Sequence, residues 1–135
     1  MLFRSPNLKK LEVWHCNRLR HMFSPSLARN LLQLEELIIQ NCGELEQIFI
    51  EDDAADMTSH REIVLPQLQK LILQQLASLV NFCPVGYHFI FPSLSKLMVF
   101  SCSKITTRFS VDQNRSVHAE AEVLTNVDVV VVDKQ

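Results

Sequence analysis

One pattern of apolar residues occurs four times along the 135-residue chain, in units that begin at Leu8, Leu34, Leu68 and Leu94. Each unit has the form L-x-x-L-x-[VIL]-x-x-[CL]-x-x-[LI]-x-x-[apolar]. Of the 24 repeated positions 23 are apolar, whereas a hydrophobic content of 47% would supply roughly 11. The exception is Arg108, which suggests that the repeat frays at its last turn. The positions are Leu8, Leu11, Val13, Cys16, Leu19 and Met22; Leu34, Leu37, Ile39, Cys42, Leu45 and Ile48; Leu68, Leu71, Leu73, Leu76, Leu79 and Phe82; and Leu94, Leu97, Val99, Cys102, Ile105 and Arg108.

The spacing of 3, 2, 3, 3 and 3 residues within a unit fits neither a continuous helix nor a simple alternating strand. It is typical of a coil with one turn per repeat, in which a short strand at L-x-[VIL] points two apolar side chains inward. The units start 26, 34 and 26 residues apart, and leucine-rich repeats run about 20–29 residues. We therefore predict an α/β leucine-rich-repeat solenoid, with a short parallel β-sheet on the concave face and loops and short helices on the convex side. Leu11, Leu37, Leu71 and Leu97 should lie side by side on adjoining parallel strands.

The rest of the chain divides around these units. We expect the repeats to fill residues 1–109, with an acidic insertion at 51–62 where the second interval is eight residues longer than the others. That insertion is interpreted as a solvated, disordered loop or as an electrostatic contact for a basic partner. The tail, 110–135, ends in a valine run that could be a final strand covering the open end of the stack or a sticky segment. We expect a poorly ordered tail containing one strand.

Two connections carry local signals. The stretch 24–31 has Ser24 as a helix N-cap and Pro25 at the first helical position, so it predicts a short helix. The run from Cys83 to Tyr87 contains Pro84 and Gly86 and predicts a loop.

Composition argues against several functions. The net charge is −2, which does not favour nucleic acid, and no apolar run approaches the ~20 residues of a membrane-spanning helix. Three of the four cysteines share one repeat position, which indicates small, buried, reduced thiols and no metal site. Cys83 and His88 could be imagined as a nucleophile and a base, but neither sits in an evident pocket and no third orienting group is apparent. We expect no cofactor and no enzymatic activity.

The outward positions of the four predicted strands should form three parallel columns. The middle column is apolar in three of four places and is flanked by two aromatic residues, which suits protein binding. The alternative interpretation is that β-branched and aromatic residues simply favour strands. The columns are Lys10, Glu36, Lys70 and Lys96; Glu12, Ile38, Ile72 and Met98; and Trp14, Gln40, Gln74 and Phe100.

The P-x-L-x-x-L-x-[VIL]-x-x-C-x-x-L pattern resembles the carboxy-terminal repeats of plant nucleotide-binding leucine-rich-repeat disease-resistance proteins of the coiled-coil class. The resemblance rests on residues 6–13, 34–42 and 91–97 and covers about residues 3 to 109. It implies a cytoplasmic protein-interaction module in plant innate immunity. The partner would be a pathogen effector, a guarded host protein or the receptor's own nucleotide-binding domain, which the repeats would help to hold inactive.

The chain has no G-x-x-x-x-G-K-[ST] loop for phosphate, so it cannot be the nucleotide switch itself. It is therefore a fragment of a receptor, a truncated gene product or a free-standing decoy, and we favour a fragment. An alternative function is a leucine-rich-repeat substrate adaptor of a ubiquitin ligase, although the chain lacks an F-box-like helical segment.

Overall fold

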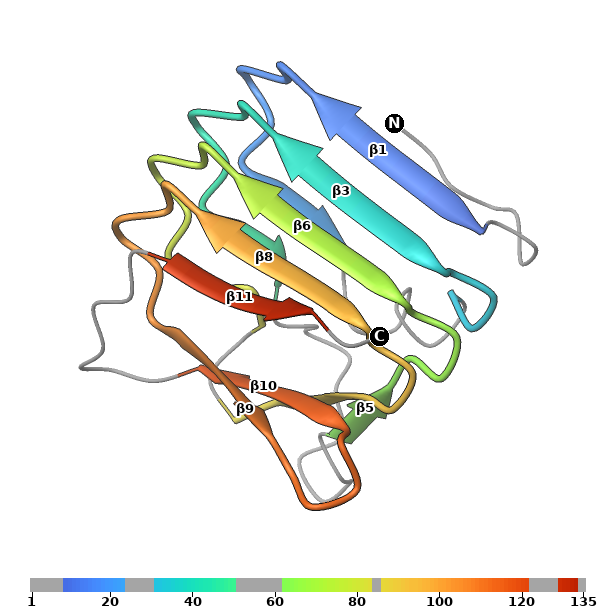
Figure 1. Ribbon diagram of the computed structural model, residues 1–135. Helices are drawn as coiled ribbons and strands as arrows, with labels where there is room; N and C mark the ends of the chain where they lie inside the picture. The colour runs from blue at the N-terminus through green and yellow to red at the C-terminus, as the bar shows by residue number, and fades with distance from the viewer. Residues whose placement is uncertain (1–8, 24–30, 51–61, 84–85, 122–128, 134–135) are drawn as a thin grey trace.

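The computed structural model describes residues 9–23, 31–50, 62–83, 86–121 and 129–133. Within these ranges the chain forms three sheets (Figure 1). The first sheet has the order β1-β3-β6-β8-β11 and the second has the order β5-β7-β10-β9, while β2 and β4 form a short pair. The strands are β1 (Lys10–Trp14), β2 (His21–Phe23), β3 (Glu36–Gln40), β4 (Gln47–Phe49), β5 (Glu62–Val64), β6 (Lys70–Gln74), β7 (His88–Phe91), β8 (Lys96–Phe100), β9 (Thr107–Val111), β10 (Val117–Ala121) and β11 (Val129–Asp133).

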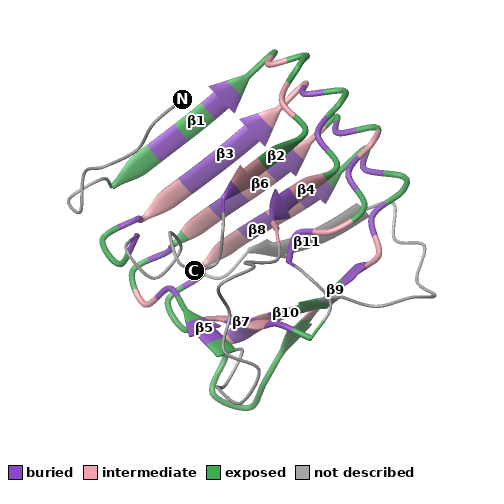
Figure 2. Ribbon diagram, turned by 180° about the vertical axis from the view of Figure 1, so that it is seen from behind, coloured by how far each residue is buried: buried purple, intermediate pink, exposed green. Residues whose placement is uncertain are grey.

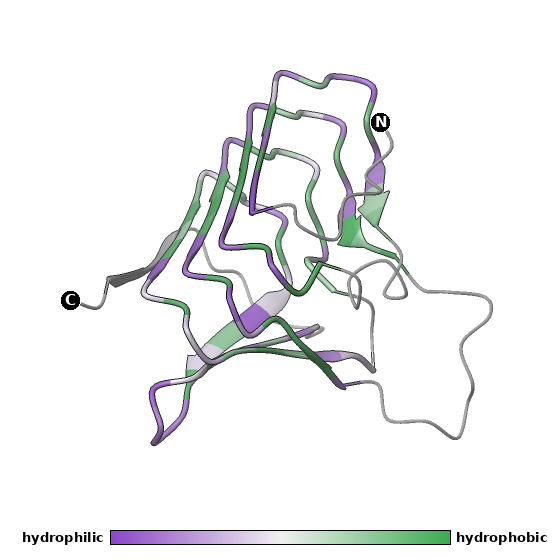
Figure 3. Ribbon diagram, turned by 90° about the vertical axis from the view of Figure 1, so that its right-hand side faces the viewer, coloured by the Kyte–Doolittle hydropathy of each residue, from purple (hydrophilic) through white to green (hydrophobic). Residues whose placement is uncertain are grey.

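The first sheet contains one strand from each sequence repeat. Strands β1, β3, β6 and β8 are parallel and lie side by side in chain order. Their register places Leu11, Leu37, Leu71 and Leu97 opposite one another, and these four leucines are at most 6% exposed. The prediction of equivalent leucines stacked on adjoining parallel strands is therefore confirmed. Figure 3 shows the successive turns of the chain nested behind one another.

A left-handed residue follows each of these four strands and turns the chain out of the sheet. The residues are His15, Asn41, Gln75 and Ser101, with φ between 55 and 58°. A side chain disfavours this conformation, but the bends stack and share hydrogen bonds. The backbone N–H of His15 donates to the carbonyl of Gln40 at 3.1 Å, and the N–H groups of Asn41 and Gln75 donate to the next strand in the same way. The repeat therefore extends beyond the apolar positions to the backbone of the bend.

The cysteine position comes directly after the bend. The thiols of Cys16, Cys42 and Cys102 each donate to the carbonyl two residues earlier, at 3.4–3.5 Å. Burial raises the pKa of Cys42 and Cys102, so both are protonated donors at neutral pH. All four cysteines are free thiols. At this position of the repeat, cysteine thus supplies a small apolar group and a weak hydrogen-bond donor. Leu76, at the same position of the third unit, supplies only the apolar group.

The expected short helices are not observed in the described residues (Figure 2). Residues 24–30 of the predicted helix lie outside the described residues. Only residues 41–46 separate β3 from β4, and this connection closes in a tight turn in which the N–H of Leu45 donates to the carbonyl of Cys42 at 3.1 Å. Such a connection is too short for a helix, because a stable helical segment needs several turns. The chain crosses the side opposite the first sheet as β2 and β4 instead.

A cluster of phenylalanine rings in the core brings together rings from the β2–β4 pair, from Phe82 and from the second sheet. Phe82 lies at its centre, with ring centroids 5.3 Å from Phe49, 5.6 Å from Phe89 and 5.9 Å from Phe91. These four rings are fully buried. Aromatic rings at these separations add to the stabilisation that their buried area gives. Phe82 comes from a repeat unit, whereas Phe89 and Phe91 come from β7, so the cluster joins the repeats to the second sheet.

The last repeat does not fray, although Arg108 in the sequence suggested that it would. Arg108 is exposed, and its neighbour Thr107 is buried, at 2% exposure, at the start of β9. In the preceding unit the N–H of Ile48 donates to a backbone carbonyl, that of Asn81. Here the N–H of Phe82 donates to the hydroxyl oxygen of Thr107 at 2.7 Å. A side-chain hydroxyl thus replaces the backbone carbonyl as acceptor in the last of these hydrogen bonds between units, and the chain continues as strand β9.

The expectation of a poorly ordered tail with one strand is wrong for the described residues. Strands β9 and β10 form an antiparallel hairpin, and β11 pairs antiparallel with β8 at the edge of the first sheet. The final strand therefore covers the end of the stack, which was one of the two possibilities for the valine run. Residues 51–61 of the acidic insertion lie outside the described residues, and Glu62 begins β5. The division of the chain at residue 109 stays a prediction.

Candidate protein-binding face

The outward residues of β1, β3, β6 and β8 form a surface that we call the strand face. The register places its twelve residues in three columns that cross the strands. The inward residues of the same strands are buried, so the alternation of the pleat sends these twelve to the opposite side. The columns are Lys10, Glu36, Lys70 and Lys96; Glu12, Ile38, Ile72 and Met98; and Trp14, Gln40, Gln74 and Phe100.

Two ion pairs of the strand face centre on Lys10. Lys10 Nζ lies 3.1 Å from Glu12 Oε2 and 3.9 Å from Glu36 Oε1. The hydrogen bond and charge of Glu12 raise the pKa of Lys10, and the bond from Lys10 lowers the pKa of Glu12. Both groups are exposed, so these ion pairs contribute little to stability. Glu12 is shared between Lys10 and the indole N–H of Trp14.

The middle column is an apolar strip. Ile38, between β1 and β6, is only 9% exposed although it faces outward. Ile72 and Met98 continue the strip as half-buried side chains. A partner that covers the strip would remove apolar surface from water.

The third column carries an exposed aromatic residue at each end. Trp14 is 48% and Phe100 is 43% exposed, and three strand spacings put them about 14 Å apart. The indole Nε1 of Trp14 donates to Glu12 Oε1 at 3.0 Å, which holds the ring in place. Between the aromatics, the Gln40 amide donates to Gln74 Oε1 at 3.1 Å. The column therefore presents two exposed aromatic residues with a hydrogen-bonded amide pair between them.

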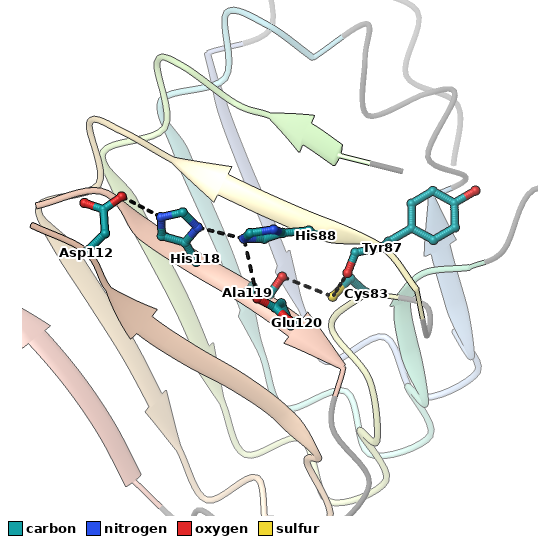
Figure 4. A network of polar contacts seen from close by, with 7 residues as sticks. All are labelled: Cys83, Tyr87, His88, Asp112, His118, Ala119 and Glu120. Atoms are coloured by element: carbon teal, nitrogen blue, oxygen red, sulfur yellow. Dashed lines mark hydrogen bonds and ion pairs between the residues drawn. The ribbon is translucent and has the colours of Figure 1, made fainter. Parts of the chain in front are cut away.

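A second polar group, which the sequence did not predict, lies on the outer face of the second sheet (Figure 4). Its members are Asp112, His118, His88 and Glu120. Nε2 of His118 lies 2.7 Å from Asp112 Oδ2, and its Nδ1 lies 2.7 Å from Nε2 of His88. Glu120 Oε1 is 3.7 Å from Nε2 of His88. The alternating His118-Ala119-Glu120 was a local signal, but nothing in the sequence linked it to His88, which is 30 residues away.

Cys83 does not offer an accessible nucleophile. The residue is fully buried, and its thiol lies 3.6 Å from the carbonyl oxygen of Ala119 and 4.0 Å from that of Tyr87 (Figure 4). Both contacts point the sulfur at backbone acceptors. A nucleophile must reach its substrate, so this geometry does not suit covalent catalysis.

The described residues contain no group of three or more His, Cys, Asp or Glu side chains arranged to hold a metal ion. Likewise, none of the described segments forms a helix of the length and apolarity that crossing a membrane requires.

Comparison with known proteins gave one match. A family model described as "Plant disease resistance protein RPS2-like, leucine-rich repeats" matches residues 3–122. The match covers most of the chain, including the four repeats, β9 and β10. Neither the curated proteins nor the solved structures gave a match.

Proposed function

Since the chain belongs to the leucine-rich-repeat family of RPS2-like plant disease resistance proteins, we propose that its strand face binds protein in plant defence. The partner would be a pathogen effector, a guarded host protein or the nucleotide-binding domain of the same receptor, held inactive by that contact. The observation that carries the proposal is the third column, in which two exposed aromatic residues flank an ordered amide pair. Large aromatic side chains with few rotatable bonds dominate many protein interfaces.

The proposed function does not include catalysis. Catalysis would require an acid, a base or a nucleophile that converges on a substrate. On the strand face, Lys10 forms ion pairs with both Glu12 and Glu36. Free thiols in all four cysteine positions are consistent with a reducing compartment, and we propose the cytoplasm. The family match also favours an immune-receptor module over a ubiquitin-ligase adaptor.

The test compares partner capture by matched variants. The full chain, fused to a proximity-labelling enzyme, would be expressed in leaf tissue with and without pathogen challenge. Trp14→Ala and Phe100→Ala each remove one anchor from the strand face, and each should deplete the same set of labelled proteins at least several-fold. Val111→Ala is the matched control, because Val111 is also 48% exposed but lies on β9.

Purified chains then test direct binding to the proteins that the two variants lose. Each variant should unfold at nearly the wild-type temperature, since exposed substitutions change stability little. The proposal would be wrong if Trp14→Ala and Phe100→Ala retained every labelled protein, or if Val111→Ala lost the same ones.

A further inference from the structure

Two histidine rings on the outer face of the second sheet direct nitrogen atoms at each other. His88 lies on β7 and His118 on β10, and Nε2 of the first is 2.7 Å from Nδ1 of the second. Their inward neighbours Phe89 and Ala119 are fully buried, which holds both strands in place. His118 is also well packed, with 18% of its side chain exposed, whereas His88 is 34% exposed. The pair is therefore held by the sheet and open to solvent on one side.

Asp112 determines which nitrogen of His118 carries a proton. The carboxylate Oδ2 lies 2.7 Å from Nε2 of His118, and an ionised carboxylate can only accept a hydrogen bond. The other oxygen, Oδ1, accepts the backbone N–H groups of Asn114 at 2.8 Å and Ser116 at 2.9 Å, which fixes the carboxylate in this orientation. In neutral His118 the proton is thus on Nε2, and Nδ1 presents a lone pair toward His88. A carboxylate behind a histidine is the usual support of a metal-binding imidazole.

We propose that His88 and His118 form a binding site for a divalent transition-metal cation such as Zn²⁺, with Nε2 of His88 and Nδ1 of His118 as ligands. Asp112 is the positioning residue for His118, and water completes the coordination shell. His88 then carries its proton on Nδ1, a change of tautomer that releases no proton overall. Imidazole suits zinc, copper and nickel better than it suits calcium or magnesium.

The distances are close to those that such an ion needs. With Zn–N bonds of about 2.0–2.1 Å and tetrahedral angles, the two nitrogens would lie about 3.4 Å apart. The rings must therefore separate by about 0.7 Å, which small side-chain rotations can supply. Glu120 Oε1, 3.7 Å from Nε2 of His88, brings a negative charge next to the ion. Among the described residues, which hold no group of three ligands, His88 and His118 are the two that the site uses.

Isothermal titration of the full chain with ZnCl₂ tests the site. One Zn²⁺ should bind per chain, and Asp112→Asn should weaken binding by about 10–100-fold through loss of the supporting carboxylate. His88→Gln and His118→Gln should each weaken it more than Asp112→Asn does. Two controls should bind as the wild type does. His21→Gln removes an exposed histidine on β2, and Cys16→Ser removes the least buried thiol among the described cysteines.

Thermal unfolding gives a second readout. Saturating Zn²⁺ should raise the Tm of the wild type and of His21→Gln, because an ion that binds the folded chain stabilises it, and should leave the Tm of His118→Gln unchanged. If His118→Gln does not fold, NMR of the wild-type chain tests the site instead. Zn²⁺ should then shift the ring resonances of His88 and His118 and leave those of His21 unchanged. The proposal is overturned if up to 1 mM Zn²⁺ produces neither heat nor a Tm shift. A dissociation constant of 1 mM corresponds to roughly 4 kcal/mol of binding free energy, which is the weakest binding that this test accepts. It is equally overturned if the wild type, His88→Gln and His118→Gln bind with equal affinity.

Discussion

Strands β1, β3, β6 and β8 of the first sheet repeat one sequence pattern, whereas β5, β7, β10 and β9 of the second sheet share none. In the first sheet each strand meets its equivalent in the next unit, so Leu71 packs between two other leucines of the same position. In the second sheet parallel and antiparallel pairs are mixed, and β5 lies beside β7 although β6 separates them in the chain. The repeats supply a regular outward face, and the irregular sheet closes the other side of the core.

The largest expected effect comes from breaking the regular sheet at its centre. Leu71→Asp places a carboxylate at a fully buried position between Leu37 and Leu97. Burying an unpaired charge costs several kcal/mol, which is comparable to the whole stability of a small domain. The chain should lose its cooperative thermal transition, as followed by circular dichroism. Leu37→Asp should have the same effect.

The matched control for Leu71→Asp is Gln74→Asp on the same strand. Gln74 faces outward and loses only its hydrogen bond with Gln40, which is worth about 1 kcal/mol. This variant should keep a cooperative transition. A normal transition in Leu71→Asp would show that the stacked leucines do not hold the chain together.

The next effect tests whether the two sheets share one core. Phe82→Ala empties the centre of the ring cluster, where Phe82 contacts Phe49 from the repeats and Phe89 from β7. A buried phenylalanine replaced by alanine typically costs about 3–5 kcal/mol, because a cavity remains. The free energy of unfolding in urea should fall by that amount in a single transition.

Phe100→Ala provides the comparison for Phe82→Ala. Phe100 is 43% exposed on the strand face, so its removal should cost a small fraction of the loss in Phe82→Ala. Two separate transitions in Phe82→Ala, one for each sheet, would show that the sheets are independently stable and have two separate cores.

A smaller effect is expected where the regular pattern ends. Thr107→Val keeps the shape of the side chain but removes the hydroxyl that accepts the N–H of Phe82 at 2.7 Å. Leaving a buried donor unsatisfied costs about 1–3 kcal/mol. Urea unfolding should register the loss, and the Phe82 amide should exchange its hydrogen faster. Thr107→Ser keeps the hydroxyl and should preserve the slow exchange at Phe82; equal exchange in both variants would contradict the role of the hydroxyl.

The first sheet was predictable from sequence because the period of the apolar residues fixes both strand and register. A one-residue slip would turn Leu37 outward and Ile38 inward, so the pattern permits one alignment. The same register gave the three columns of the strand face. Their role in binding stays a prediction, since side-chain exposure shows what is available and does not identify a partner.

The second sheet was not predictable in the same way. The pairing of His88 with Glu120, and of Glu120 with Arg108, joins segments that share no template and are separated by loops of unequal length. Thr107 also lacked a local signal, because its burial depends on where β9 leaves the last repeat. Tertiary contacts set these positions, and a repeat pattern contains no information about them.

The smallest effect concerns the hairpin between β9 and β10, and it depends on pH. Asp112 accepts hydrogen bonds from the ring of His118 and from the backbone N–H groups of Asn114 and Ser116. The bond from His118 is the main reason that the pKa of Asp112 lies below the ordinary value of 3.8. A lowered pKa in the folded state means that Asp112 stabilises the fold above the unfolded pKa, and that this contribution is lost as the pH falls through the folded pKa. At pH values above 3.8 the hairpin should keep its protected Asn114 and Ser116 amides. Protonation of folded Asp112, which occurs at a pH lower than 3.8, should expose them to faster hydrogen exchange.

Asp112→Asn isolates this contribution because an amide cannot ionise. The Asn114 and Ser116 amides should then exchange faster at pH 7, and the step below pH 4 should disappear, while the Phe82 amide between the sheets keeps its wild-type protection. Since the carboxylate is solvent-exposed, the change in Tm should be small. If the increase in exchange below pH 4 persisted in Asp112→Asn, it would come from another carboxylate. In that case the hairpin would depend on its pairing with β7 and not on its own turn.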